Sequence, residues 1–300
     1  MESPHPNVLV DIDGDVGTIT IDRPERMNAC TGAMFDGLHR AAIIMRNAGP
    51  RVVVFRGGGE HFCSGADVSG EKSDAIEGVD HGLHSMRRIG DAVIALHDLP
   101  MPTIAAVDGV CVGAGFGFAL AADLMVCTDR ARFSLIFARR ALSLDFGTSY
   151  LLPQRVGLHR AKEMALTANE FDAVASQEIG FVNRVVPAAE LDAAVGEFVD
   201  RIATGPPLAL SMSKRLLDNA AHSSLAQSVE AESLAQNVNF TTSDVAEAGQ
   251  AFIEKRTNPV PRPVTLRRRR LSAFHDFRCI SCFSARLLAE SNNMKCSRKA

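Results

Sequence analysis

Two glycine-rich segments are the features of this sequence best suited to bind an anionic group. They read HFCSGAD at 61–67 and DGVCVGAGFG at 108–117, and each follows a short apolar run. Glycine lets the backbone turn sharply and present its N–H groups without a side chain in the way. Where the second segment opens a helix, the first free N–H groups and the helix dipole also favour negative charge. One amide from each segment would form an oxyanion hole, in which a carbonyl can become an enolate.

Two other interpretations of these glycines stay open from the residues alone. Glycine after a strand often does no more than close a tight turn. A dinucleotide-binding G-x-G-x-x-G motif that begins at Gly113 would need glycine at position 118, where the sequence has Phe118. The N-terminal hairpin described below is also unlike the start of a nucleotide-binding fold. A nicotinamide-dependent enzyme is therefore the least favoured of the three interpretations.

The segments that must position these turns alternate between strands and helices. Residues 8–21 alternate apolar and polar side chains around Asp13-Gly14, which predicts a β-hairpin because Asp-Gly accepts positive φ angles. An amphipathic helix is predicted at 31–46, and another helix is expected to begin near Phe116. Apolar runs predict buried strands at 51–56, 102–107, 124–127 and 181–186. This alternation predicts an α/β core.

After Pro187 the strand signals stop, and four helices are predicted at 189–204, 207–220, 225–240 and 244–256, the last with Ser243 as its N-cap. The predicted domains are an α/β core at 1–188, a helical region at 189–258, and a basic tail at 259–300 that we expect to be disordered. Cys279-x-x-Cys282 in that tail is a weak signal for zinc.

Composition limits the classes of function. The chain has 300 residues, 46% of them hydrophobic, which suits a globular protein with a large core. No apolar stretch approaches the roughly 20 residues of a membrane span, and residues 1–7 lack the basic and apolar regions of a signal peptide. We therefore expect a cytoplasmic protein. Four scattered cysteines are expected to be reduced, buried thiols, namely Cys30, Cys63, Cys111 and Cys127.

The net charge of -3 conceals an uneven distribution. Residues 261–300 hold ten basic and two acidic residues, which leaves a net charge of -11 on the first 260. A strongly acidic body argues against nucleic acid as the main partner.

Four motifs resemble those of the crotonase (enoyl-CoA hydratase/isomerase) superfamily, in the family's order and at its spacing. They are DRPERMNA at 22–29, FCSGAD at 62–67, GAG at 113–115 followed by Asp123, and a C-terminal pattern from Phe240 to Arg256. The resemblance covers residues from about 8 to 258. It implies a spiral of ββα units, a helical trimerisation region, and coenzyme A thioesters as substrates.

The resemblance also implies roles for individual residues. The backbone N–H groups of Ala66 and Ala114 would be the oxyanion donors. The residues implied at the coenzyme A site, with the basic ones on its phosphates, are Arg23, Arg26, Ala66, Asp67 and Lys255. No metal or redox cofactor is implied, because coenzyme A is part of the substrate. The implied partner is a further copy of the chain, in a homotrimer or a dimer of trimers.

Two positions depart from the pattern of the family's hydratases. Where those enzymes carry catalytic glutamates, this sequence has Gly117 and Phe137, neither of which can titrate. Each acid/base group is typically worth about 10²–10⁴ in rate, so ordinary hydration should be nearly abolished. Asp145 instead matches the catalytic aspartate of dienoyl-CoA isomerases and ring-type enoyl-CoA isomerases of the superfamily. Double-bond isomerisation through an enolate, with Asp145 as acid and base, is therefore favoured.

Several alternatives remain beside this hypothesis. Asp145 could act only as the N-cap of a helix at 147–152. The chain could be a hydratase with a non-standard acid/base set, or a decayed protein that still binds coenzyme A. Aryl-CoA dehalogenation is set aside, because the partner histidine of that subgroup is replaced by Gly90. Under the favoured hypothesis, the apolar neighbours of Asp145 are expected to desolvate its carboxyl group and raise its pKa.

Overall fold

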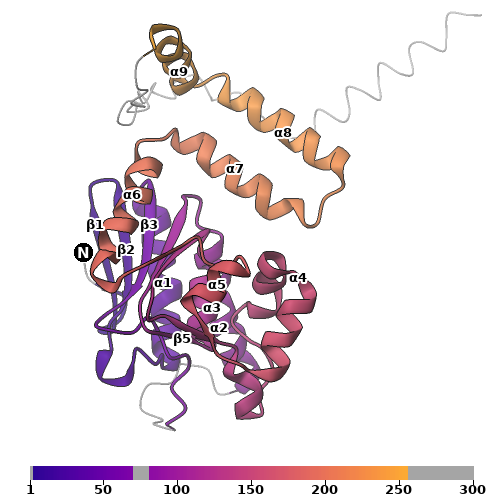
Figure 1. Ribbon diagram of the computed structural model, residues 1–300. Helices are drawn as coiled ribbons and strands as arrows, with labels where there is room; N and C mark the ends of the chain where they lie inside the picture. Colours follow the sequence, from indigo (N-terminus) through magenta and orange to yellow (C-terminus); the bar gives the residue numbers. More distant parts are fainter. Residues whose placement is uncertain (1–2, 70–80, 256–300) are drawn as a thin grey trace, which may run out of the picture. The chain divides into compact units, whose positions relative to one another are not determined.

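The computed structural model describes residues 3–69 and 81–255 (Figure 1). The chain divides into two units, Met1–Val260 and Pro261–Ala300. The second unit lies outside the described residues, so the disordered basic tail and its Cys279-x-x-Cys282 pair stay predictions.

A six-stranded sheet forms the centre of the first unit, in the order β1-β2-β3-β4-β6-β9. Its strands are β1 (Val8–Asp13), β2 (Val16–Ile21), β3 (Val52–Gly57), β4 (Thr103–Val107), β6 (Leu124–Thr128) and β9 (Arg184–Val186). β1 and β2 are antiparallel about the predicted turn, where Gly14 has a φ of +57°. This antiparallel pair confirms the predicted hairpin. The remaining neighbours are parallel, and β3, β4 and β6 confirm the predicted buried strands. The strand predicted at 181–186 is shorter, because only Arg184–Val186 form β9, and these residues are half-buried.

A second sheet of three short strands carries the chain into the second glycine-rich segment. Its strands are β5 (Val110–Val112), β7 (Arg132–Ser134) and β8 (Phe171–Asp172), in the order β5-β7-β8. β5 runs directly into Gly113, which is the N-cap of the buried helix α3 (Ala114–Leu120). The glycine-rich segment therefore opens a helix, as the sequence predicts.

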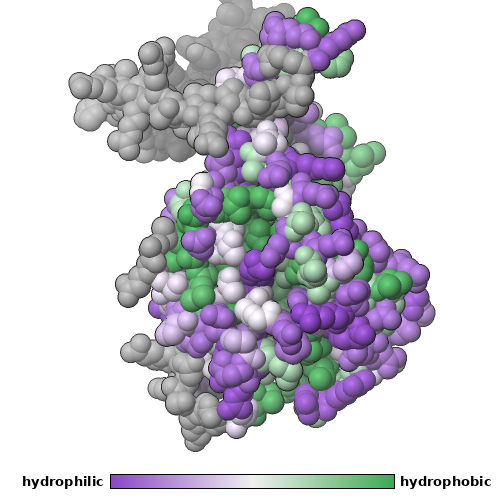
Figure 2. Space-filling view, turned by 60° about the vertical axis from the view of Figure 1, so that its left-hand side comes forward, coloured by the Kyte–Doolittle hydropathy of each residue, from purple (hydrophilic) through white to green (hydrophobic). Residues whose placement is uncertain are grey.

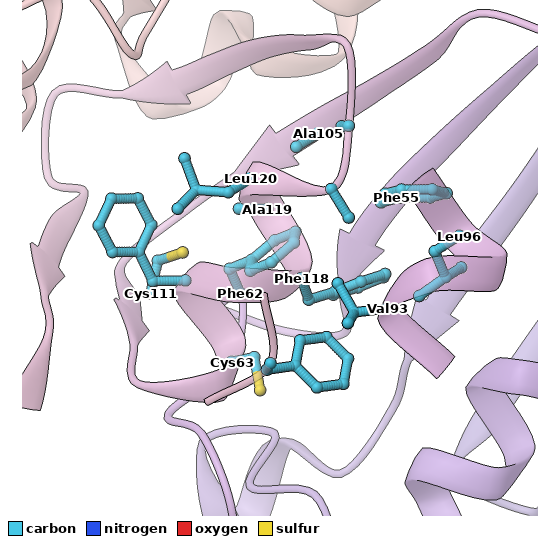
Figure 3. Packing of buried hydrophobic residues seen from close by; sticks show 14 of the residues in the cluster. Phe55, Phe62, Cys63, Val93, Leu96, Ala105, Cys111, Phe118, Ala119 and Leu120 are labelled. Atoms are coloured by element: carbon cyan, nitrogen blue, oxygen red, sulfur yellow. The ribbon is translucent and has the colours of Figure 1, made fainter. Parts of the chain in front are cut away.

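Both faces of the large sheet are covered by apolar side chains, which explains why its parallel strands read as continuous apolar runs. On one face the ring of Phe118 stacks on those of Phe55 and Phe62, with centroids 4.9 and 5.3 Å apart (Figure 3). Helices α1 (Gly32–Ala48) and α2 (Gly82–His97) pack together, and the Thr31 side chain caps α1. On the other face, α6 (Leu191–Ala203) covers β3, β4 and β6.

The rest of the described chain is mainly helical, as predicted after the core. Two helices precede α6, namely α4 (Thr148–Thr167) and α5 (Ala173–Glu178). Three follow it, namely α7 (Pro207–Ala220), α8 (Leu225–Asn239) and α9 (Ser243–Glu254). One correction concerns the start of α9, which is capped by Thr242 rather than by Ser243, because the Thr242 hydroxyl accepts from the N–H of Val245. Among the described residues, no helix has the length and apolarity needed to cross a bilayer.

Helices α7 to α9 and the C-cap of α8 carry large apolar side chains that are exposed among the described residues. Six of them are more than 60% exposed, namely Leu217, Leu225, Leu234, Phe240, Phe252 and Ile253. Apolar groups also interrupt the mainly polar surface of the face drawn in Figure 2. Exposed apolar side chains, where they gather into a patch, commonly mark a contact with another chain.

Candidate active site

The two glycine-rich turns meet at Gly65 and Gly113. Cys63 pairs with Val110 and Val112 through backbone hydrogen bonds of 3.0 and 3.1 Å, which brings the first turn beside β5. A Cβ atom on Gly65 would lie 3.4 Å from the backbone nitrogen of Ala114. Gly65 and Gly113 have φ angles of +94° and +56°, a region in which glycine is favoured. The fold therefore brings together the segments predicted to supply the oxyanion donors.

The predicted donors themselves have unused hydrogen-bonding capacity. Ala114 is the first residue of α3, so its N–H has no acceptor within the helix. The N–H of Ala66 donates to no other described residue, and its neighbour Asp67 bonds instead to the carbonyl oxygen of Cys30. Both amides are thus available to an acceptor from outside the chain, which is what an oxyanion hole requires.

A buried asparagine fixes the loop that supports the first turn. The side chain of Asn28, fully buried, donates to the carbonyl oxygens of Gly58 and His61 at 2.9 and 2.6 Å and accepts from the N–H of Arg23 at 2.8 Å. Its φ of +58° is one that asparagine tolerates better than most residues. This role was not predicted from the sequence, although the motif DRPERMNA contains Asn28.

Arg23 and Asp67, both predicted at the coenzyme A site, bind each other. The Arg23 guanidinium lies 2.6 Å from a carboxylate oxygen of Asp67, and the two side chains are 12% and 11% exposed. The hydrogen bond from Arg23 lowers the pKa of Asp67 to about 2. This ion pair ties the supporting loop to the turn that carries Ala66.

The other two basic residues predicted at the coenzyme A site are exposed. Arg26 ends the short helix η1 (Pro24–Arg26), and its carbonyl oxygen accepts from the hydroxyl of Ser64 in the first turn. Lys255 is the left-handed C-cap of α9. The roles of these residues in binding coenzyme A stay predictions.

Asp145 lies in a tight turn just before α4, and its side chain is not a helix cap. The N-cap of α4 is Gly147, with no side-chain cap, so the capping interpretation is wrong. Asp145 is half-buried, and its Oδ1 atom is buried without a hydrogen-bond partner among the described residues. Burial raises the pKa of this carboxyl group to about 6. The pKa shift has the expected direction, and its cause is the burial of the carboxyl group.

The two positions without hydratase glutamates are both buried. Gly117 lies in the middle of α3, against the backbone of Phe146. Phe137 is 5% exposed in the short helix η3 (Ile136–Arg140). Neither side chain can supply or accept a proton.

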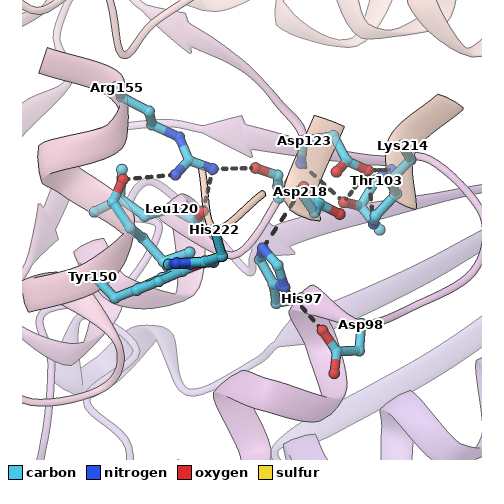
Figure 4. Close-up of polar contacts among 12 residues, drawn as sticks. His97, Asp98, Thr103, Leu120, Asp123, Tyr150, Arg155, Lys214, Asp218 and His222 are labelled. Carbon is cyan, nitrogen blue, oxygen red and sulfur yellow. Dashed lines mark hydrogen bonds and ion pairs between the residues drawn. The ribbon is translucent and has the colours of Figure 1, made fainter. Parts of the chain in front are cut away.

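A polar network joins α7 to the core near the start of α4 (Figure 4). Lys214 lies 2.9 Å from Asp123, which also accepts the N–H and hydroxyl of Thr103. The hydroxyl of Tyr150 and Nε2 of His222 are 2.6 Å apart. Tyr150 is 43% exposed, and its ring stacks on that of His222, with centroids 5.5 Å apart. We assign the network to the attachment of α7.

The four predicted cysteines are buried and free. Cys30 and Cys63 lie close together, with their sulfur atoms 3.9 Å apart. The thiol of Cys63 also approaches the carbonyl oxygen of Asn28 at 3.1 Å, so these thiols pack beneath the first turn.

Comparison with known proteins gives the family. A family model described as Enoyl-CoA hydratase/isomerase matches residues 11–260. The chain is 31% identical to the short-chain-enoyl-CoA hydratase of Clostridium acetobutylicum, over 83% of this chain and 95% of that protein. It is 30% identical to the peroxisomal Delta(3,5)-Delta(2,4)-dienoyl-CoA isomerase of Arabidopsis thaliana, over 81% of this chain and 92% of that protein.

A solved structure agrees with these relatives. The enoyl-CoA hydratase of Bacillus anthracis superposes with a TM-score of 0.78 at 30% identity, over 84% of this chain and 98% of that one. The relatives thus include both hydratases and isomerases, and the solved structure shares the fold described above. With its paired glycine-rich turns and its sheet order, the chain belongs to the enoyl-CoA hydratase/isomerase family of the crotonase superfamily.

Proposed function

We propose that this protein isomerises a carbon–carbon double bond in an enoyl-CoA, with Asp145 as the acid and base. The observation that carries the proposal is the buried, unpartnered oxygen of Asp145 and the accompanying rise of its pKa to about 6. A carboxyl group with this pKa is ionised at neutral pH, yet it holds a proton more readily than an exposed aspartate. It is suited to take a proton and return it within one turnover.

In the proposed reaction, the carboxylate of Asp145 takes a proton from C2 of a 3-enoyl-CoA. The electron pair of the broken C–H bond forms a dienolate, whose negative oxygen is held by the N–H groups of Ala66 and Ala114. The protonated Asp145 then returns the proton to C4, and the double bond moves to C2–C3. Atoms and charge balance without water, so no second acid is needed.

Hydration needs a group that activates water at C3 and another that protonates C2. Gly117 and Phe137 supply neither, and the buried Phe137 also makes its surroundings apolar. We therefore expect hydratase turnover to lie far below isomerase turnover. A hydratase with a non-standard acid/base set and a protein that only binds coenzyme A are the competing hypotheses.

The test is a paired assay with a 3-enoyl-CoA and with crotonyl-CoA, each followed by the ultraviolet absorbance of the conjugated thioester. Isomerisation creates this absorbance from the first substrate, and hydration removes it from the second. We expect the first reaction and a loss of about 10²-fold or more in Asp145→Asn. Rapid hydration of crotonyl-CoA, or full activity in Asp145→Asn, would refute the proposal.

We also propose that the exposed apolar side chains of α7 to α9 pack against other copies of the chain, in a homotrimer or a dimer of trimers. Four residues are proposed to serve the coenzyme A site, namely Arg23, Arg26, Asp67 and Lys255. The enzyme is proposed to work in the cytoplasm. The exposure of side chains such as Leu225 and Phe252, at 82% and 84%, supports an oligomer. Light scattering coupled to size-exclusion chromatography would measure three or six chains per particle, and a monomer would refute this part.

A further inference from the structure

Gly117 is in contact with the turn that carries Asp145. A Cβ atom on Gly117 would lie 2.4 Å from the carbonyl oxygen of Phe146 and 3.1 Å from its Cβ. Heavy atoms do not approach so closely, and a backbone carbonyl cannot rotate away as the end of a flexible side chain can. The absence of a side chain at 117 is therefore what allows residue 146 to lie against α3.

The same turn has an unusual backbone. Phe146 and Gly147 have φ angles of +46° and +72°, and the left-handed region is unfavourable for a bulky residue such as phenylalanine. Two contacts hold Phe146 in place: its buried ring lies 5.2 Å from the ring of Phe35, and its backbone rests on Gly117. The turn is thus maintained by packing from two sides.

A third contact holds Asp145 itself. The carbonyl oxygen of Asp145 accepts from the N–H of Thr148 at 3.1 Å and from its hydroxyl at 2.8 Å. Thr148 is fully buried. No described group binds the buried Oδ1 atom of Asp145, so no hydrogen bond to that atom fixes the carboxylate.

We propose that Gly117 and Thr148 are positioning residues, which hold the turn 145–147 so that the carboxylate of Asp145 faces the paired glycine-rich turns. This inference rests on the proposed function for the role of Asp145 in catalysis. It also makes residue 117 a determinant of specificity, because a side chain at 117 forces the backbone of Phe146 to shift. A glutamate placed at 117 displaces Asp145 instead of adding a second acid.

Three variants test the positioning role, and Gly117→Glu tests the inference about specificity. Gly117→Ala introduces the smallest clash with Phe146. Thr148→Val removes the hydrogen bond from the hydroxyl to the carbonyl oxygen of Asp145 and leaves Gly117 unchanged, which covers the outcome that Gly117→Ala does not fold. Thr148→Ser keeps the hydroxyl. The matched control is Gly196→Ala in α6, where an added Cβ meets nothing within 4 Å.

Two measurements are made on each variant. The first is kcat and KM for the 3-enoyl-CoA across pH, and the second is the pKa of Asp145 from carbon NMR of its carboxyl group in the free enzyme. We expect Gly117→Ala to lower kcat by about 10- to 100-fold with KM nearly unchanged. We also expect its Asp145 pKa to fall from about 6 toward 3.8, because the displaced carboxyl group gains water. Thr148→Val shows both effects more weakly, and Thr148→Ser and Gly196→Ala show neither.

The two proposals fail in different ways. Folded Gly117→Ala and Thr148→Val enzymes with the parent kcat and the parent Asp145 pKa would overturn the positioning role. A parent enzyme without isomerase activity would refute the proposed function. In that case a fall in the Asp145 pKa of Gly117→Ala would still support the positioning role, because that measurement needs no turnover. Efficient hydration of crotonyl-CoA by Gly117→Glu would overturn the inference about specificity.

Discussion

Replacing Asp145 with asparagine should stabilise the folded protein at neutral pH, although the same change removes the proposed acid and base. The pKa of this carboxyl group is about 6 in the folded protein, above its ordinary value of 3.8. A raised pKa means that the folded state resists ionisation more than the unfolded state does. At neutral pH the charge on Asp145 therefore lowers the free energy of unfolding.

The magnitude follows from the two pKa values. A difference of about two pKa units corresponds to about 3 kcal/mol above pH 6. Because Asp145 is only half-buried, water screens part of this cost, and we expect Asp145→Asn to gain about 1–3 kcal/mol at pH 7. The gain should shrink as the pH falls from 6 toward 4, and it should vanish below 3.8, where both states of the parent protein are protonated.

The assay is urea unfolding of the parent and variant proteins at several pH values between 3.5 and 7.5 (roughly the span of the linkage). Protein concentration is held constant, because oligomers add a dependence on concentration. Circular dichroism follows the loss of helix. A variant no more stable than the parent at pH 7, or a gain that does not change with pH, would refute the assignment of an ionised, desolvated carboxylate at 145.

The remaining predictions concern the supports of the site, all measured by urea unfolding. Asp67→Asn should lower the free energy of unfolding by about 1–2 kcal/mol at pH 7, because Asp67 has a depressed pKa of about 2 in the folded protein. This loss should disappear as the pH falls through 2, and a loss independent of pH would contradict the prediction. Asn28→Ala should lose about 3 kcal/mol, since two buried carbonyl oxygens lose their donor, and a loss below about 1 kcal/mol would be inconsistent with that role. Lys214→Met should lower the free energy of unfolding by about 3 kcal/mol, because it removes the Lys214 cation from the Asp123 carboxylate. An unchanged urea midpoint would show that this ion pair is dispensable for stability.

Much of the fold could be predicted because its signals are local. The hairpin at Asp13-Gly14, the apolar strands β3 and β4, and the helix after Gly113 each follow from a few neighbouring residues. The pairing of the two glycine-rich turns was expected from the family's motifs, and the contact between Gly65 and Ala114 agrees with it.

The features that the sequence did not reveal depend on distant contacts. Aspartate is a favoured N-cap residue, so the sequence around Asp145 is compatible with a helix cap. In the structure, the left-handed residues Phe146 and Gly147 separate Asp145 from α4, and Gly147 is the N-cap. The role of Asn28 requires carbonyl groups about 30 residues away, at Gly58 and His61. Neither arrangement leaves a periodic or compositional pattern.

The cost of the Asp145 turn bears on whether the site is active or decayed. An ionised carboxylate whose buried Oδ1 binds no described group and a left-handed phenylalanine both destabilise the folded state, and single substitutions such as Asp145→Asn would relieve the first. Most stabilising substitutions leave the fold unchanged and reduce function where function needs the strain. A protein that merely bound coenzyme A through its glycine-rich turns would have no use for this carboxylate. The destabilisation of the folded state at residues 145–147 therefore favours an enzyme over a decayed binding protein. An NMR titration that gave Asp145 a pKa near 3.8 would weaken this conclusion.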